Sequence, residues 1–134
     1  MAPRKIKIKQ EDRSAAGDFL KKAEDNHAQM LVAVEAENFN AAGTLAIQCA
    51  ISSADAICVC EKGIRSISGD HFDVCYLVTS VSLPDAKEKA SLLKRIISKK
   101  NLIQYERRNI YRQEAEEIVN ASSKFYQWVV SHIK

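Results

Sequence analysis

The residues of this chain best suited to chemistry lie between Arg65 and His71. An arginine can hold a phosphate group through several hydrogen bonds, and a histidine can donate or accept a proton near neutral pH. Asp70 could orient the imidazole, and the N–H groups of a helix beginning there would favour an anion. We therefore interpret Arg65, Asp70 and His71 as candidate catalytic residues acting on a phosphate. A structural alternative stays open, in which the histidine caps the helix and the arginine pairs with a carboxylate such as Asp70 or Asp55.

A second set of polar residues interrupts the segment 41–62, which is otherwise apolar. Its members are spaced four, four and three residues apart: Thr44, Gln48, Ser52 and Asp55. This spacing puts them on one stripe of a helix. Because a helix that is apolar on nearly all sides must be surrounded by other helices, the stripe needs partners. It is either the wall of a small-ligand or RNA groove anchored by Asp55, or a structural network in which that acid accepts hydrogen bonds from Arg65, Tyr105 or an arginine near position 107.

Basic residues gather in the C-terminal half of the chain, with tyrosines between them. They are Lys94, Arg95, Lys99, Lys100, Arg107, Arg108 and Arg112, and the tyrosines are Tyr105 and Tyr111. Basic side chains bind phosphates, and tyrosine rings stack on unpaired bases, so this pattern predicts RNA contact. Nearby glutamates favour the alternative of an ordinary solvated surface. The candidate binding residues are Gln48, Ser52, Asp55, Tyr105, Arg107 and Arg108.

Bulk composition narrows the class of protein. A net charge of +3 permits an acidic partner without requiring one. The N-terminus lacks the apolar core of a secretory signal, and polar residues break the longest apolar segment, so we expect a cytoplasmic location and no membrane partner. Four cysteines, at positions 49, 58, 60 and 75, lack the spacing of a zinc site and should be free and mostly buried. We expect neither a metal nor a cofactor.

Hydrophobic periodicity predicts an all-α protein, an up-and-down antiparallel bundle of four to five helices. Residues 1–13 are expected to form a basic flexible arm, and residues 14–134 a single helical bundle domain. The alternation of basic residues with Ile6 and Ile8 leaves open a short strand in this arm that pairs with a partner. Helices are expected at about 14–38, 41–62, 70–80, 86–99 and 112–133, with residues 64–69 a loop and 101–111 irregular. The apolar helix at 41–62 should begin after a cap at Asn40, end at Gly63 and lie at the centre.

The order of these parts resembles the HEPN family of small helical bundles. The resemblance covers about residues 15–133 and is carried by Asn40-Ala-Ala42, Ser53-Ala-Asp-Ala-Ile57, Glu61-Lys-Gly-Ile-Arg-Ser66 with His71, and Ala115-Glu-Glu-Ile-Val-Asn-Ala121 followed by Phe125-Tyr126. It implies a homodimer and a protein partner such as a nucleotidyltransferase or an antitoxin, in a toxin–antitoxin or defence system.

Active members of this family are metal-independent ribonucleases whose signature is an arginine, a polar residue and, a few positions on, a histidine near the start of the C-terminal helix. At that place this chain has Arg107, Arg108 and Asn109, but positions 112–115 hold no histidine. We therefore expect a HEPN-like module that is non-catalytic or degenerate and acts through protein partners and RNA binding. A formal match of the signature from Arg65 to His71 leaves a metal-independent endoribonuclease as the alternative.

Overall fold

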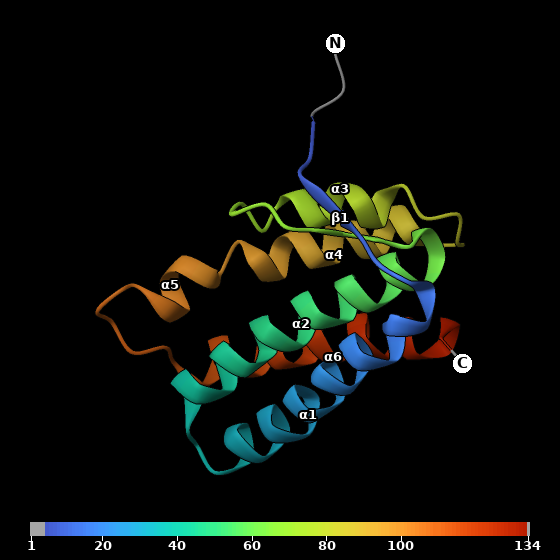
Figure 1. The fold of residues 1–134 in the computed structure, drawn as a ribbon. Coiled ribbons are helices and arrows are strands. Elements are labelled where there is room, and N and C mark those ends of the chain that lie inside the picture. The colour runs from blue at the N-terminus through green and yellow to red at the C-terminus, as the bar shows by residue number, and fades with distance from the viewer. Residues whose placement is uncertain (1–4, 134) are drawn as a thin grey trace.

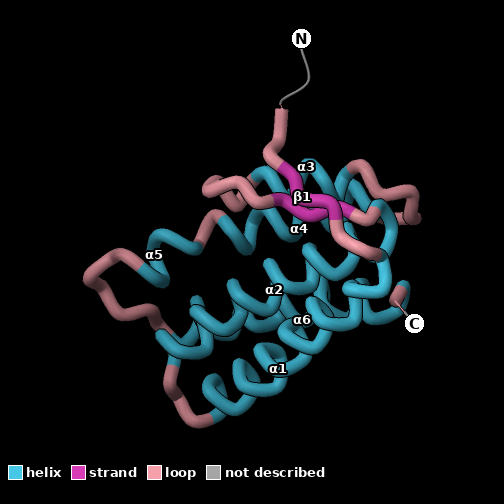
Figure 2. The backbone as a smooth tube through the Cα atoms, viewed as in Figure 1, coloured by secondary structure: helices cyan, strands magenta, loops and turns pink. Residues whose placement is uncertain are grey.

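The computed structural model describes residues 5–133 and shows a mostly α-helical bundle (Figure 1). The long helices are α1 (Ala16–Glu35), α2 (Phe39–Lys62) and α6 (Arg112–His132). The shorter ones are α3 (Asp73–Thr79), α4 (Ala86–Ile97) and α5 (Lys100–Gln104), and a 3-10 turn, η1 (Arg13–Ala15), precedes α1. Strands β1 (Ile8–Gln10) and β2 (Ile64–Ser66) form a small antiparallel ribbon (Figure 2). The predicted helical class is confirmed.

Helix α2 lies at the centre of the bundle, where it packs against α1 and α6 and also contacts α3, α4 and α5. Its buried positions are mostly small side chains, which lets the neighbouring backbones approach closely. The helix ends at Gly63, whose φ of 65° lies in the left-handed region that glycine adopts without strain. By length and composition alone α2 could cross a membrane, but most of its apolar window is buried inside the bundle, as in any core helix.

The polar stripe of α2 is not covered by other helices. Gln48 is exposed, while Thr44, Ser52 and Asp55 are partly exposed. The expectation that this helix is surrounded on all sides is therefore wrong for one face. The neighbouring helices pack against the alanine, isoleucine and cysteine positions, so the polar side chains keep contact with water.

Helix α1 is locked to α6 through a histidine. The Nε2 of His27 lies 3.0 Å from the hydroxyl oxygen of Ser123, and its ring stacks on Tyr126 with centroids 4.3 Å apart. Burial lowers the pKa of His27 below its ordinary value of 6.5. This histidine on the apolar stripe of α1 is a packed structural residue.

Several boundaries differ from the sequence expectations. Residues 8–10 are paired in the ribbon rather than in a free arm, with Lys9 opposite Arg65; residues 1–4 of the expected arm lie outside the described part of the chain. Four residues of the segment expected to be irregular, 101–104, belong to α5. Asn40 is not the cap of α2: its amide joins the α5–α6 loop by accepting from the N–H of Ile110 at 3.0 Å and donating to Asn109.

Candidate functional site

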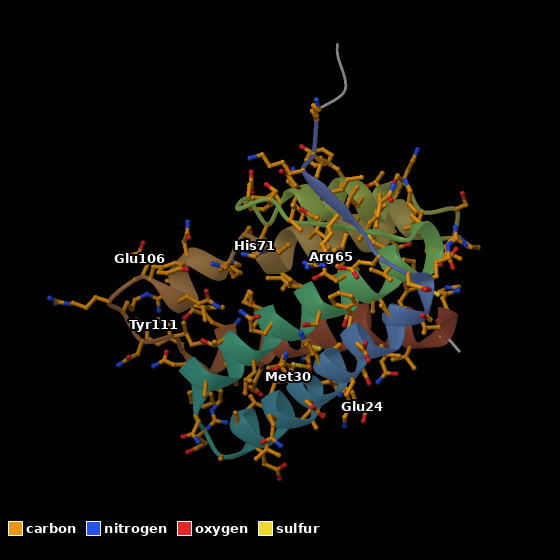
Figure 3. The ribbon with its side chains drawn as sticks, in the orientation of Figure 1. Glu24, Met30, Arg65, His71, Glu106 and Tyr111 are labelled. Atoms are coloured by element: carbon orange, nitrogen blue, oxygen red, sulfur yellow. The ribbon has the colours of Figure 1, made fainter. Side chains whose placement is uncertain are left out.

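Asp55, Arg65 and His71 line one pocket of about 310 Å³ between α2, β2 and the loop before α3. We call it the acid–base pocket; the other residues that line it are Ile51, Ser66, Ile67, Ser68 and Val74. Figure 3 shows Arg65 and His71 on the same side of α2. The structure thus joins the acid of the polar stripe to the arginine and histidine of the segment that follows the helix.

The β-ribbon positions Arg65. Its Nε donates to Oε1 of Glu11 at 3.1 Å, and its Cζ lies 5.4 Å from the ring centroid of Phe19 in α1. The expected pairing with Asp70 or Asp55 is therefore wrong, because Glu11 is the carboxylate that Arg65 contacts. Within residues 5–133, the two terminal NH₂ groups of this arginine make no hydrogen bond and can donate to a ligand.

Asp55 is half-buried, and burial raises the pKa of its carboxyl from 3.8 to about 6, against the opposing charges of Arg65 and Lys22. No residue of the described chain donates a hydrogen bond to this carboxylate. The network expected from Arg65, Tyr105 or an arginine near 107 is therefore not formed. A half-buried acid that titrates near neutral pH and faces a pocket is typical of functional sites.

His71 lies at the other side of the acid–base pocket. Burial and the charge of Lys100 lower its pKa below 6.5, while the charge of Asp70 acts in the opposite direction. His71 does not cap α3, which begins at Asp73 with Phe72 as its N-cap. This histidine is thus mostly neutral at pH 7 and able to accept a proton.

The loop before α3 is held by its own side chains. The hydroxyl of Ser66 accepts from the N–H of Ser68, that of Ser68 accepts from the N–H of Asp70, and the Asp70 carboxylate accepts from the N–H of Phe72 at 2.9 Å. These three N–H groups are therefore not available to an anion, contrary to the expectation for this loop. Asp70 shapes the turn that presents His71.

The tyrosines of the α5–α6 segment are exposed, and each makes a cation–π contact with a basic side chain. Tyr105 is 71% exposed, and the Nζ of Lys100 lies 4.7 Å from its ring centroid and donates to its hydroxyl. Tyr111 is 66% exposed beneath the guanidinium of Arg108. Arg108 also donates twice to the carboxylate of Glu114, at 2.9 and 2.7 Å, so most of its charge is compensated.

The candidate binding residues fall into three places rather than one. Asp55 faces the pocket, whereas Gln48 and Ser52 lie outside it, nearer the N-terminus of α2. The third set, from Tyr105 to Arg108, lies on the α5–α6 segment. Lys100 links the pocket to the α5–α6 segment, because its charge acts on His71 and its ammonium contacts the ring of Tyr105. Glu11 contacts Arg65, and the charge of Lys22 acts on Asp55. The sequence did not indicate either role, because both residues lie far along the chain from their partners.

All four cysteines are free, and no group of three or more His, Cys, Asp or Glu within residues 5–133 is arranged to hold a metal ion. The site offers acid, base and cationic groups from its own side chains. No known protein family, curated protein or solved structure matches the chain.

Proposed function

We propose that this chain is a HEPN-like helical module that binds single-stranded RNA at one region made of two parts. One part is the acid–base pocket, and the other is the exposed α5–α6 surface of Tyr105, Arg107, Arg108 and Tyr111, which we call the Tyr105 surface. The observation that carries the proposal is that one lysine serves both places: the charge of Lys100 acts on His71, and its ammonium lies 4.7 Å from the centroid of the Tyr105 ring. Binding of single strands generally combines cations that track the backbone with aromatic faces that stack on bases.

The charges around the pocket support this proposal. Lys22, Arg65 and Lys100 act on or line the pocket, against the acids Asp55 and Asp70 and the partner of Arg65, Glu11. A region with so few uncompensated cations would contact only a few phosphates. We therefore expect modest affinity, with the logarithm of the binding constant falling by about 0.7 per phosphate contact for each tenfold rise in salt.

The test is a fluorescence-anisotropy titration of a labelled single-stranded RNA over a range of KCl concentrations. Lys100→Gln should weaken binding and flatten the salt dependence, because one phosphate contact is lost. Lys87→Gln, which removes an exposed lysine of α4 outside the binding region, is the matched control and should leave both unchanged. Absent or salt-insensitive RNA binding would contradict the proposal.

Protein contacts are the other part of the proposal. The homodimer, the nucleotidyltransferase or antitoxin partner, the defence context and the cytoplasmic location stay predictions from the sequence. Leu31 and Val32 on α1 support a protein contact, because they are 42% and 60% exposed and adjacent. Light scattering of the purified chain tests the homodimer, and Val32→Glu should reduce association if this face carries it.

Metal-independent RNA cleavage is a second candidate function, favoured because Asp55 and His71 line the same pocket as Arg65, where burial raises the pKa of Asp55 to about 6 and lowers that of His71 below 6.5. In such a reaction neutral His71 would take the proton of a ribose 2′-hydroxyl as its oxygen attacks phosphorus. The protonated Asp55 carboxyl, which burial favours, would give its proton to the departing 5′-oxygen, and Arg65 would hold the phosphate. Chelator-resistant cleavage of labelled RNA that is lost in His71→Ala but kept in His132→Ala would favour the enzyme; binding without cleavage would favour the module.

A further inference from the structure

The acid–base pocket contains an acceptor without a donor from the protein. The Asp55 carboxylate receives no hydrogen bond from residues 5–133, although it is half-buried. An ionised carboxylate only accepts, and its two oxygens are best used by two parallel donors. The pocket therefore suits a ligand that presents two neighbouring N–H or O–H groups.

The rest of the pocket supplies donors and apolar side chains. The terminal NH₂ groups of Arg65 are free among the described residues, as noted above. The hydroxyls of Ser66 and Ser68 accept from backbone N–H groups, so each keeps its own O–H to donate. Apolar side chains complete the walls: Ile51, Ile67 and Val74. A volume of about 310 Å³ is at the lower end of the range of about 300–1,000 Å³ for small-ligand pockets, which suits a single base.

We propose that this pocket selects a guanine base of single-stranded RNA, with the Asp55 carboxylate accepting from guanine N1–H and the 2-amino group. Of the four RNA bases, only guanine presents two adjacent donors on its Watson–Crick edge; adenine, cytosine and uracil present one donor group each. The donors of Arg65, Ser66 and Ser68 remain for the guanine O6 and N7 acceptors. Sequence-specific proteins commonly read unpaired bases on this edge.

This inference rests on the proposed RNA binding but makes a separate claim. RNA binding through cations and the Tyr105 surface requires no base preference. Selection of guanine requires the acid at position 55, which contributes nothing to phosphate contacts. Guanine selection can therefore fail while RNA binding stands.

The experiment compares three labelled uridine oligomers that carry one central guanosine, inosine or adenosine, at neutral pH. We expect the guanosine oligomer to bind about tenfold more tightly than the adenosine oligomer, as is typical of one bidentate side chain–base contact. Inosine, which lacks the 2-amino group, should fall between them. Asp55→Asn should remove the difference, because asparagine offers one acceptor oxygen in place of two and its NH₂ group would face the second guanine donor.

Asp85→Asn is the matched control, because it makes the same change at an exposed carboxylate outside the pocket, at a left-handed position that asparagine tolerates; it should keep the guanosine preference. Equal binding of all three oligomers by the wild-type chain would overturn guanine selection and leave RNA binding standing. Guanosine preference that persists in Asp55→Asn would also overturn the inference. Binding of none of the oligomers would overturn the proposed function itself.

Discussion

Asp55→Asn should make the folded chain more stable at neutral pH. The substitution keeps the shape of the side chain and removes its charge, which the half-buried site disfavours. The pKa of this carboxyl is about 6 in the folded chain, against 3.8 as its ordinary value. At 1.36 kcal/mol per pKa unit, ionised Asp55 costs roughly 3 kcal/mol of folding free energy, and relaxation and water in the pocket reduce the expected gain to about 1–3 kcal/mol.

The sign of this effect depends on pH. The folded pKa of Asp55 is raised, so the stability contributed by its protonated form is fully present below 3.8 and is lost as the pH rises through about 6. The advantage of the asparagine variant should therefore be largest above about pH 7 and nearly absent near pH 4. Urea unfolding followed by circular dichroism at both pH values measures it, with Ser52→Ala as the control.

One result would refute this reasoning. If Asp55→Asn is less stable than the wild-type chain above about pH 7 by 1 kcal/mol or more, the carboxylate makes hydrogen bonds that stabilise the fold. Asp55 would then belong to a structural network, and its role as a ligand acceptor would lose its physical basis. A gain in stability together with weaker RNA binding would indicate the trade-off common at functional sites.

Three further predictions concern the residues that support the site. His27→Ala should lower the free energy of unfolding by about 1–2 kcal/mol, since the Tyr126 stack and the Ser123 hydrogen bond are lost. Because the folded pKa of His27 is lowered, the stability advantage of the wild-type chain over His27→Ala should shrink as the pH falls below 6.5, and urea melts of both chains at several pH values check this. Glu11→Gln should strengthen RNA binding a few-fold in anisotropy titrations while changing stability by only about 0–1 kcal/mol, because it removes the charge that opposes Arg65; unchanged or weaker binding would count against a phosphate contact by that arginine. Tyr105→Ala should weaken single-strand binding by about 1–3 kcal/mol at unchanged melting temperature, because one stacking face is lost; equal affinity would remove Tyr105 from the site.

The sequence predicted the elements of this fold that depend on local signals. Helix α2 has a long run of small and apolar residues with Gly63 as its stop signal, and its extent was predicted within a few residues. Helix α5 was missed because it has only five residues and no side-chain cap. The alternation near Ile6 and Ile8 left a short strand open, but nothing in the sequence indicated that it pairs with residues 64–66, which were expected to be a loop. Helix α5 and the ribbon both depend on contacts with distant segments.

The candidate site was found in pieces. Asp55 was identified from its place in an apolar helix, and Arg65 with His71 from their chemistry, but nothing in the sequence placed all three in one pocket. Their meeting depends on the left-handed turn at Gly63 and on the pairing of β2 with β1, which brings Glu11 to Arg65. The open face of α2 was also unexpected, because the side chains that cover a helix are decided by the lengths and positions of its neighbours.

The most direct test of the account is an NMR titration of the isotope-labelled chain with a single-stranded RNA at low salt. RNA bound at the proposed region should shift the backbone amide signals of residues 65–71 and 100–105 together, and raising the salt should reverse both sets. Shifts confined to the exposed face of α1 around Leu31 and Val32, or no shifts at all, would contradict the central claim that the acid–base pocket and the Tyr105 surface form one RNA-binding region.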